Sequence, residues 1–124
     1  MNAKILIVED NANNRLLLNA LLTHYGYVVI EATNGEEGLN MAREQHPDII
    51  IMDIQMPVMD GVSAVKALKS DPGTKNIKTI AVTSYAMKGD RESFLSAGFD
   101  GYLSKPIDTR ALPGLIKQYL SDNV

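Results

Sequence analysis

Charged and hydroxyl side chains follow short apolar runs at several places in the sequence. In chain order they are Glu9, Asp10, Asp53, Thr83 and Lys105. Carboxylates brought close together repel one another, and oxygen ligands of this kind suit a hard divalent cation such as Mg²⁺. Lys105 would add a second positive charge. This chemistry requires a fold that brings residues far apart along the chain to one place.

Short apolar runs alternate with segments of helical character along the chain. The runs are typical of strands buried on both faces of a parallel sheet, and they cover residues 5–8, 27–30, 49–52, 80–82 and, more weakly, 101–103. The helical segments cover residues 13–25, 36–44, 62–70, 88–97 and part of 109–120. Five strand–helix repeats predict a doubly wound α/β domain, with helices on both faces of a five-stranded parallel sheet.

The predicted sheet brings the polar residues together. In a doubly wound sheet, ligands bind outside the carboxyl ends of the strands, where the strand order reverses. With the flavodoxin-like order 2-1-3-4-5, this point lies between the first and third strands, so Glu9, Asp10 and Asp53 would converge. Each residue alone has a simpler explanation: Asp53 could cap a helix, and Lys105 could lie in a turn. Polar groups that follow four different strands at the same edge of the sheet indicate a functional site far more specifically than any one of these residues alone.

Helix ends and faces can also be predicted. Gly26 and Gly98 follow helical segments and can adopt the left-handed conformation that ends a helix. Pro113 in the last segment lacks an amide donor, so that helix either begins near Pro113, which we expect, or is distorted. In the first helix, Leu17, Leu21 and His24 share one face, and we expect this face to pack against or border the core.

Composition limits the class of protein. The chain has 124 residues, 45% of them hydrophobic, which is typical of one globular domain spanning residues 1–124. It has no cysteine, which excludes thiol catalysis and disulfides. The net charge of -3 gives no basic excess for nucleic acid, and no apolar run approaches the roughly 20 residues that span a bilayer. We therefore expect a soluble, cytoplasmic domain that binds neither nucleic acid nor membrane.

The sequence resembles the response-regulator receiver domains of two-component signalling. The resemblance covers essentially the whole chain, and four segments carry it: residues 9–11 (EDN), 52–61 (MDIQMPVMDG), 81–84 (AVTS) and 102–106 (YLSKP). Residues 85–90 (YAMKGD) are similar to receivers of hybrid kinases and to single-domain regulators. The resemblance implies a phosphorylation-dependent switch that catalyses its own phosphorylation and dephosphorylation without being a conventional turnover enzyme.

The resemblance also implies roles for particular residues. Asp53 would accept a phosphoryl group from a phosphohistidine on a histidine kinase or a histidine phosphotransfer protein. Thr83 and Lys105 would contact the phosphoryl oxygens. The metal, Mg²⁺ or Mn²⁺, would be held by Asp10, Asp53 and the backbone carbonyl of Gln55, with Glu9 acting mainly through water. The remaining implied roles belong to Tyr85, which would slow hydrolysis, and to a cis bond before Pro106.

The implied output is a changed surface that a downstream protein reads. Thr83 would move toward the phosphoryl group and Tyr102 would turn inward. The fourth helix, fifth strand and fifth helix would then present an altered face. Such a protein could act alone or be the receiver portion of a hybrid histidine kinase.

Two other functions use similar chemistry or the same fold. A small aspartyl-phosphate hydrolase of the haloacid-dehalogenase type wants a second aspartate two residues after the nucleophile, where this chain has Gln55. A flavodoxin-like flavin carrier needs a phosphate-binding loop after the first strand, where Glu9 and Asp10 would repel the phosphate. Both are weaker interpretations than a receiver.

Overall fold

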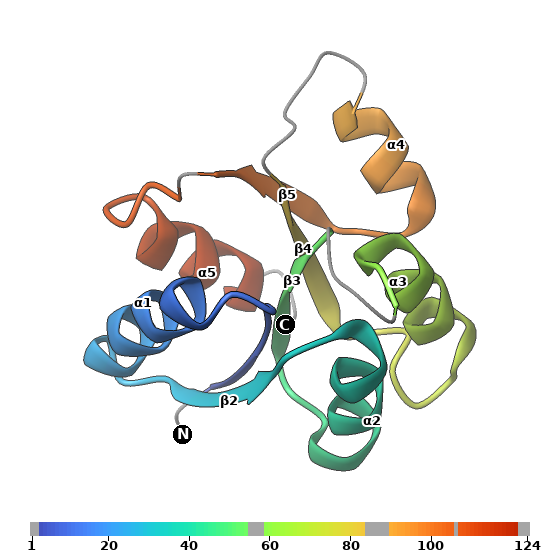
Figure 1. Ribbon diagram of the computed structural model, residues 1–124, viewed down its shortest axis with the longest axis horizontal. Coiled ribbons are helices and arrows are strands. Elements are labelled where there is room, and N and C mark those ends of the chain that lie inside the picture. The colour runs from blue at the N-terminus through green and yellow to red at the C-terminus, as the bar shows by residue number, and fades with distance from the viewer. Residues whose placement is uncertain (1–2, 55–58, 84–89, 106, 122–124) are drawn as a thin grey trace.

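The structure, a computed structural model, describes residues 3–54, 59–83, 90–105 and 107–121. Five strands and five helices alternate along the chain (Figure 1). The strands are β1 (Lys4–Val8), β2 (Val28–Ala32), β3 (Ile49–Asp53), β4 (Lys78–Thr83) and β5 (Gly101–Ser104). The helices are α1 (Ala12–His24), α2 (Gly35–Gln45), α3 (Gly61–Ser70), α4 (Asp90–Ala97) and α5 (Leu112–Ser121).

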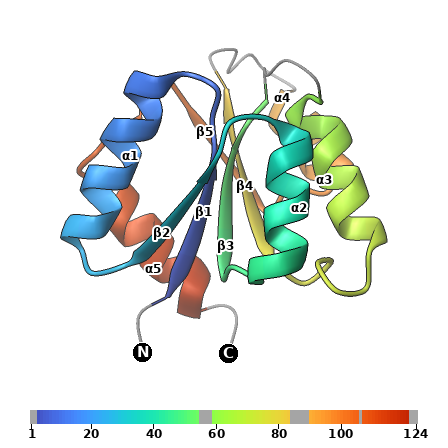
Figure 2. The same ribbon diagram turned by 60° about the horizontal axis from the view of Figure 1, so that its bottom comes forward.

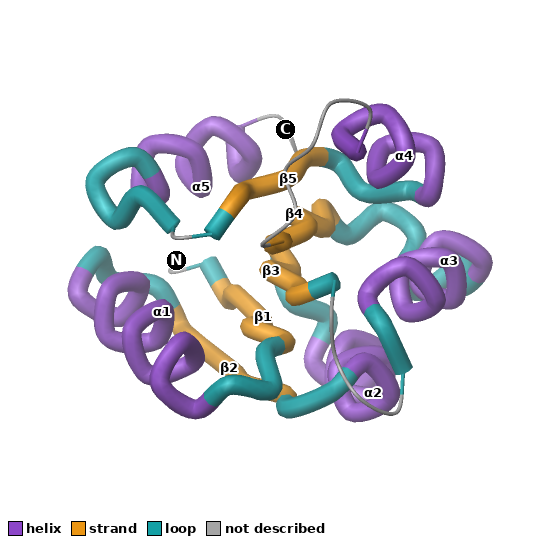
Figure 3. Tube along the Cα trace, turned by 45° about the horizontal axis from the view of Figure 1, so that its top comes forward, coloured by secondary structure: helices purple, strands orange, loops and turns teal. Residues whose placement is uncertain are grey.

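The strands form one parallel sheet in the order β2-β1-β3-β4-β5, as the sequence predicts. Helices α1 and α5 cover one face, and α2, α3 and α4 cover the other (Figures 2 and 3). The switch in strand order lies between β1 and β3, which pair directly with Val8 opposite Met52. The doubly wound, flavodoxin-like fold is therefore confirmed.

The sheet separates two apolar cores because successive strand side chains point to opposite faces. Along β1, Ile5 and Ile7 pack with α1 and α5, whereas Leu6 and Val8 pack with α2 and α3. The four side chains are fully buried. Burial on both faces explains why the strands read as continuous apolar runs rather than as alternating ones.

Local signals end the helices where the sequence indicates. Gly26 and Gly98 have positive φ values of 89° and 122° after α1 and α4. His46 also has a positive φ, 47°, at the end of α2. The sequence does not predict this conformation. The following Pro47 disfavours the right-handed helical conformation at His46, which accounts for the end of the helix there.

Two predictions about helices have different outcomes. Helix α5 begins at Leu112, one residue before Pro113, so the expected late start is confirmed. The predicted buried face of α1 is partly wrong. Leu17 and His24 are exposed, and the buried residues are Leu18 and Leu22.

The error on α1 has a physical reason. Five leucines occupy positions 16–18, 21 and 22, so apolar residues cover more than one face and spacing alone does not select the buried stripe.

Within the residues that the structure describes, no helix is both long and apolar enough to cross a membrane.

Candidate functional site

Four parallel strands bring their polar ends to the same edge of the sheet. The register places Asp53, the last residue of β3, opposite Val82, so that Thr83 follows directly along β4. Thr83 in turn pairs with Ser104, the residue before Lys105. A backbone hydrogen bond continues the pairing of β4 with β5 beyond the strands, since the Lys105 amide donates to the Thr83 carbonyl at 2.8 Å. The strand ends thus converge as the sequence predicts.

Three carboxylates cluster at this edge. Glu9, Asp10 and Asp53 each offer a carboxylate oxygen, and the three oxygens lie within 4.8 Å of one another. Lys105 reaches the cluster from the end of β5. Its Nζ lies 3.0 Å from Asp53 Oδ2 and 3.5 Å from Glu9 Oε2. One ammonium group therefore faces two carboxylates directly, with a third nearby.

Burial makes the charges in this cluster interact strongly. Glu9 and Asp53 are 2% and 3% exposed, whereas Asp10 is open to solvent. Burial, followed by the charge of Asp53, raises the pKa of Glu9 despite the nearby Lys105. Partial burial lowers the pKa of Lys105, but the hydrogen bond and charges of Asp53 and Glu9 outweigh it and raise that pKa overall. Lys105 consequently stays protonated.

The first turns of α1 hold the acidic loop, a feature that the sequence analysis misses. The Asn11 amide donates to Glu9 Oε1 at 3.2 Å, and Asn14 Nδ2 donates to the same atom at 3.5 Å. Arg15 Nη1 donates to the backbone carbonyls of Glu9 at 2.9 Å and Asp10 at 3.2 Å. The sequence carries one signal for this, because an arginine near the N-terminus of a helix opposes the helix dipole.

The start of α3 approaches the site closely through Gly61. A Cβ atom at Gly61 would lie 2.6 Å from the carbonyl oxygen of Asp53 and 2.9 Å from Cα of Ile54. Both are backbone atoms that cannot move aside cheaply. Asp60 caps α3 by accepting the Ser63 amide at 2.8 Å. The start of α3 is therefore packed against Asp53, the residue predicted to be the phosphoacceptor.

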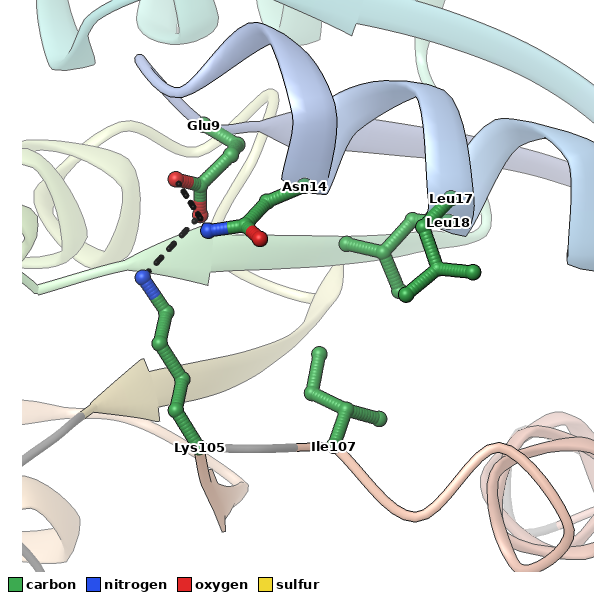
Figure 4. Close-up of a pocket in the computed structure, with 6 residues that line it drawn as sticks. All are labelled: Glu9, Asn14, Leu17, Leu18, Lys105 and Ile107. Atoms are coloured by element: carbon green, nitrogen blue, oxygen red, sulfur yellow. Dashed lines mark hydrogen bonds and ion pairs between the residues drawn. The ribbon is translucent and has the colours of Figure 1, made fainter.

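A pocket of about 350 Å³ opens beside the carboxylates (Figure 4). Glu9, Asn14 and Lys105 form its polar end, and dashed contacts join Glu9 to both other residues. Its apolar end is formed by Leu17 and Leu18 of α1 and by Ile107 after β5. The pocket therefore joins the charged site to the exposed side of α1.

Tyr102 lies on the same face of the sheet as Thr83. It pairs with Ala81, two residues before Thr83, and is partly buried. Its ring centroid lies 6.1 Å from that of Phe94 on α4, which lies 6.3 Å from that of Phe99. An aromatic chain thus connects β5 to α4.

Three predictions lie outside the described residues. They concern the backbone carbonyl of Gln55 as a metal ligand, the shielding role of Tyr85 and the cis bond before Pro106. The other predicted site residues are brought to one edge of the sheet. The described carboxylates suit Mg²⁺ chemically, because this ion prefers oxygen ligands and is commonly bound by one or two carboxylates together with water.

Comparisons with known proteins agree with this arrangement. A family model described as the response regulator receiver domain matches residues 5–117. The polar-differentiation response regulator DivK of Brucella ovis is 44% identical over 122 residues, which cover 98% of this chain and 99% of DivK.

Two solved structures are also similar. The receiver domain of a sensor histidine kinase from Pseudomonas aeruginosa, described with a magnesium ion coordinated in its active-site cleft, has 34% identity and a TM-score of 0.90, covering 98% of this chain and 99% of that one. A chemotaxis response regulator of Vibrio cholerae has 29% identity and a TM-score of 0.90, covering 96% and 99%. The chain therefore belongs to the response regulator receiver domain family of two-component signalling.

Proposed function

We propose that Asp53 accepts a phosphoryl group from a phosphohistidine on a histidine kinase or a histidine phosphotransfer protein. The observation that carries this proposal is the contact of Lys105 with Asp53 at 3.0 Å inside a cluster of three carboxylates. In the transfer, a carboxylate oxygen of Asp53 forms a bond to phosphorus. The bond from phosphorus to the imidazole nitrogen breaks, and the imidazole keeps the electron pair.

Lys105 and Thr83 stabilise the transferred group. Phosphoryl transfer depends mostly on positioning and on stabilising negative charge, and the attached group carries about −1.5 to −2 charge. Lys105 is protonated and already directed at Asp53, so little reorganisation is needed when that charge arrives. The Thr83 hydroxyl, at the end of the neighbouring strand, donates to a phosphoryl oxygen.

Asp10, Asp53 and the backbone carbonyl of Gln55 hold Mg²⁺, or Mn²⁺, in this proposal, and Glu9 acts mainly through water. When bound, the metal neutralises charge on the phosphoryl oxygens. Glu9 is buried and held by Asn11 and Asn14, which suits a fixed acceptor for an ordered water. Asp10 is exposed, which suits a ligand reached from solvent.

The donor must be a protein that brings its histidine to this edge, and α1 offers it an apolar contact. Leu16 and Leu17 are 69% and 51% exposed, and Leu17 lines the pocket that ends at Glu9 and Lys105. Exposed apolar side chains that border a reactive site favour docking of a partner. We assign this surface to the phosphodonor protein.

The output surface in this proposal is formed by α4, β5 and α5. Tyr102 lies on the same sheet face as Thr83, and its ring is beside that of Phe94 of α4. A turn of Tyr102 toward the sheet removes a ring from beside Phe94 and so changes the packing of α4. Crystal structures with and without beryllofluoride, a phosphoryl mimic, test this, and an identical Tyr102 rotamer in both would exclude the switch.

The cytoplasmic location and the existence of a downstream protein partner stay predictions.

The decisive test of the proposal is phosphotransfer to Asp53→Asn. Wild-type protein, Mg²⁺ and a small phosphodonor such as acetyl phosphate should yield a base-labile adduct on the peptide that contains Asp53. The variant should yield none, because an amide cannot attack phosphorus. A panel of purified histidine kinases then identifies the donor. An adduct on another residue, found by mass spectrometry, contradicts the proposal.

A further inference from the structure

Arg15 holds the backbone that carries two of the clustered carboxylates. Its Nη1 atom donates to the carbonyl oxygens of Glu9 at 2.9 Å and Asp10 at 3.2 Å. These contacts span five and six positions of the chain, from the end of the first turn of α1 back to the loop after β1. One rigid guanidinium group therefore fixes two successive peptide units.

The position of Arg15 is unfavourable for the helix by itself. A cation near a helix N-terminus opposes the macrodipole, and α1 has no acidic residue in its first turn to compensate. The hydrogen bonds to the two carbonyls account for a cation at this position. The side chain is partly buried, which limits its freedom to leave them.

The backbone matters most for Asp10. Glu9 has side-chain partners in Asn11 and Asn14, so its carboxylate is held directly. Among the described residues, the Asp10 carboxylate has no side-chain hydrogen bond of this kind, although it lies within the cluster. The direction of its carboxylate therefore depends on the peptide units that Arg15 holds.

We infer that Arg15 is a positioning residue for the metal ligands, acting through the backbone of Glu9 and Asp10. This inference rests on the proposed Mg²⁺ site and adds a residue to it. Groups that orient metal ligands typically change metal affinity by about 10- to 100-fold when they are replaced. Arg15 is suited to this task because Nη1 carries two N–H donors held in the plane of the guanidinium group, enough for both carbonyl oxygens, whereas an ammonium group rotates freely.

Charge and position predict opposite results, which makes the inference testable. Arg15 is a cation near an acidic cluster, so removing its charge alone should tighten Mg²⁺ binding. Loss of the hydrogen bonds to the two carbonyls should instead weaken Mg²⁺ binding. Arg15→Met removes both, and Arg15→Lys keeps the charge but replaces the planar fork with a point charge.

The experiment is a Mg²⁺ titration of metal-free protein by isothermal titration calorimetry, with unfolding followed by circular dichroism. We expect both Arg15→Met and Arg15→Lys to bind Mg²⁺ about 10-fold more weakly than wild type. Arg43→Met is the matched control, because Arg43 pairs with Asp71 away from the acidic cluster. It should lose some stability and keep wild-type Mg²⁺ affinity.

The outcomes separate the two ideas. Tighter or unchanged binding in Arg15→Met overturns the inference, and so does wild-type affinity in Arg15→Lys. A purely structural role would lower the unfolding midpoint and leave the affinity unchanged, which also overturns it. If Arg15→Met does not fold, Arg15→Lys decides alone. Failure of the wild-type protein to bind Mg²⁺ would instead contradict the proposed function.

Discussion

Two lysine–aspartate pairs lie at opposite edges of the sheet, and their surroundings differ. At the carboxyl edge, Lys105 contacts Asp53 and Glu9. At the amino edge, Lys69 Nζ contacts Asp100 Oδ2 at 3.2 Å and also donates to the carbonyls of Lys75 and Ile77. The two lysine side chains are similarly exposed, at 22% and 24%. The exposure of the lysines therefore does not distinguish the edges, whereas the carboxylates do differ, since Asp53 is 3% exposed and Asp100 27%.

The amino edge is electrostatically balanced. Lys69 faces one carboxylate and two carbonyls, and Asp100 Oδ2 also accepts the Thr79 amide at 2.8 Å. The carboxyl edge is not balanced, because one lysine faces the acidic cluster of Glu9, Asp10 and Asp53. A balanced network stabilises the fold, whereas an excess of negative charge leaves a place for a cation. The contrast teaches that an excess of carboxylates, two of them buried, identifies the functional edge here.

The largest expected difference is between Lys105→Met and Lys69→Met. Lys105→Met should slow phosphorylation of Asp53 by about 100-fold, because a fixed charge on the transferred group is lost. Lys69→Met should leave the rate unchanged but lower the free energy of unfolding by about 2 kcal/mol, because Asp100 and two carbonyls lose a donor. Rates with acetyl phosphate and urea unfolding measure both. Equal loss of rate in the two variants would remove the distinction between the edges.

The next largest effect is expected from glycine substitutions at each edge. Gly61→Ala places Cβ against backbone atoms of Asp53 and Ile54, and Gly98→Ala strains a residue with φ of 122°. Each should cost about 1–3 kcal/mol of stability. Only Gly61→Ala should also weaken Mg²⁺ binding, since it displaces Asp53. Calorimetric Mg²⁺ titration of both variants checks this, and a weakened site in Gly98→Ala would contradict it.

A smaller effect is expected when one charge is removed from the cluster. Asp10→Asn reduces the repulsion among the carboxylates, so the metal-free protein should unfold about 3 °C higher than wild type. The same variant should bind Mg²⁺ about 10-fold more weakly, and added Mg²⁺ should raise its midpoint less. Thermal unfolding with and without Mg²⁺ measures both. A lower midpoint without metal would mean that the cluster is not strained by repulsion.

The smallest expected effect concerns Asp71, near the amino edge. The hydrogen bond from the Gly73 amide, followed by that from Arg43, lowers the pKa of Asp71. A lowered pKa contributes stability above the unfolded value, and this is lost as pH falls through the folded value. Asp71→Asn should therefore be slightly less stable than wild type at neutral pH, and the difference should vanish in acid. Unfolding at several pH values tests this, and a constant difference would exclude the ionised carboxylate as its source.

Much of the candidate site can be predicted from sequence because strand ends are easy to locate. The apolar runs that become β1, β3 and β4 are followed by Glu9, Asp53 and Thr83, and a parallel sheet must bring such ends together. The glycines after α1 and α4 are equally readable, since few other residues adopt a positive φ. These are local signals that do not depend on which helix face meets the sheet.

The supporting contacts could not be predicted in the same way. A cation near the start of α1 hints that Arg15 has a partner, but nothing in the sequence indicates that Asn14 and Arg15 reach back to the loop carrying Glu9. That contact depends on how α1 is rotated about its axis, and the leucines of α1 leave the rotation ambiguous. Packing of Leu18 and Leu22 against the sheet decides it.

By itself, the sequence determined the order of strands and helices, the strand ends and the types of residue found there, because hydrophobic period and glycine conformation act over a few residues. Only the tertiary structure decided how the charges are shared: Lys105 between two carboxylates, Lys69 with one, and Arg15 on two carbonyls. These contacts join residues from separate elements. Their geometry follows from the packing of helices on the sheet, which no short stretch of sequence specifies.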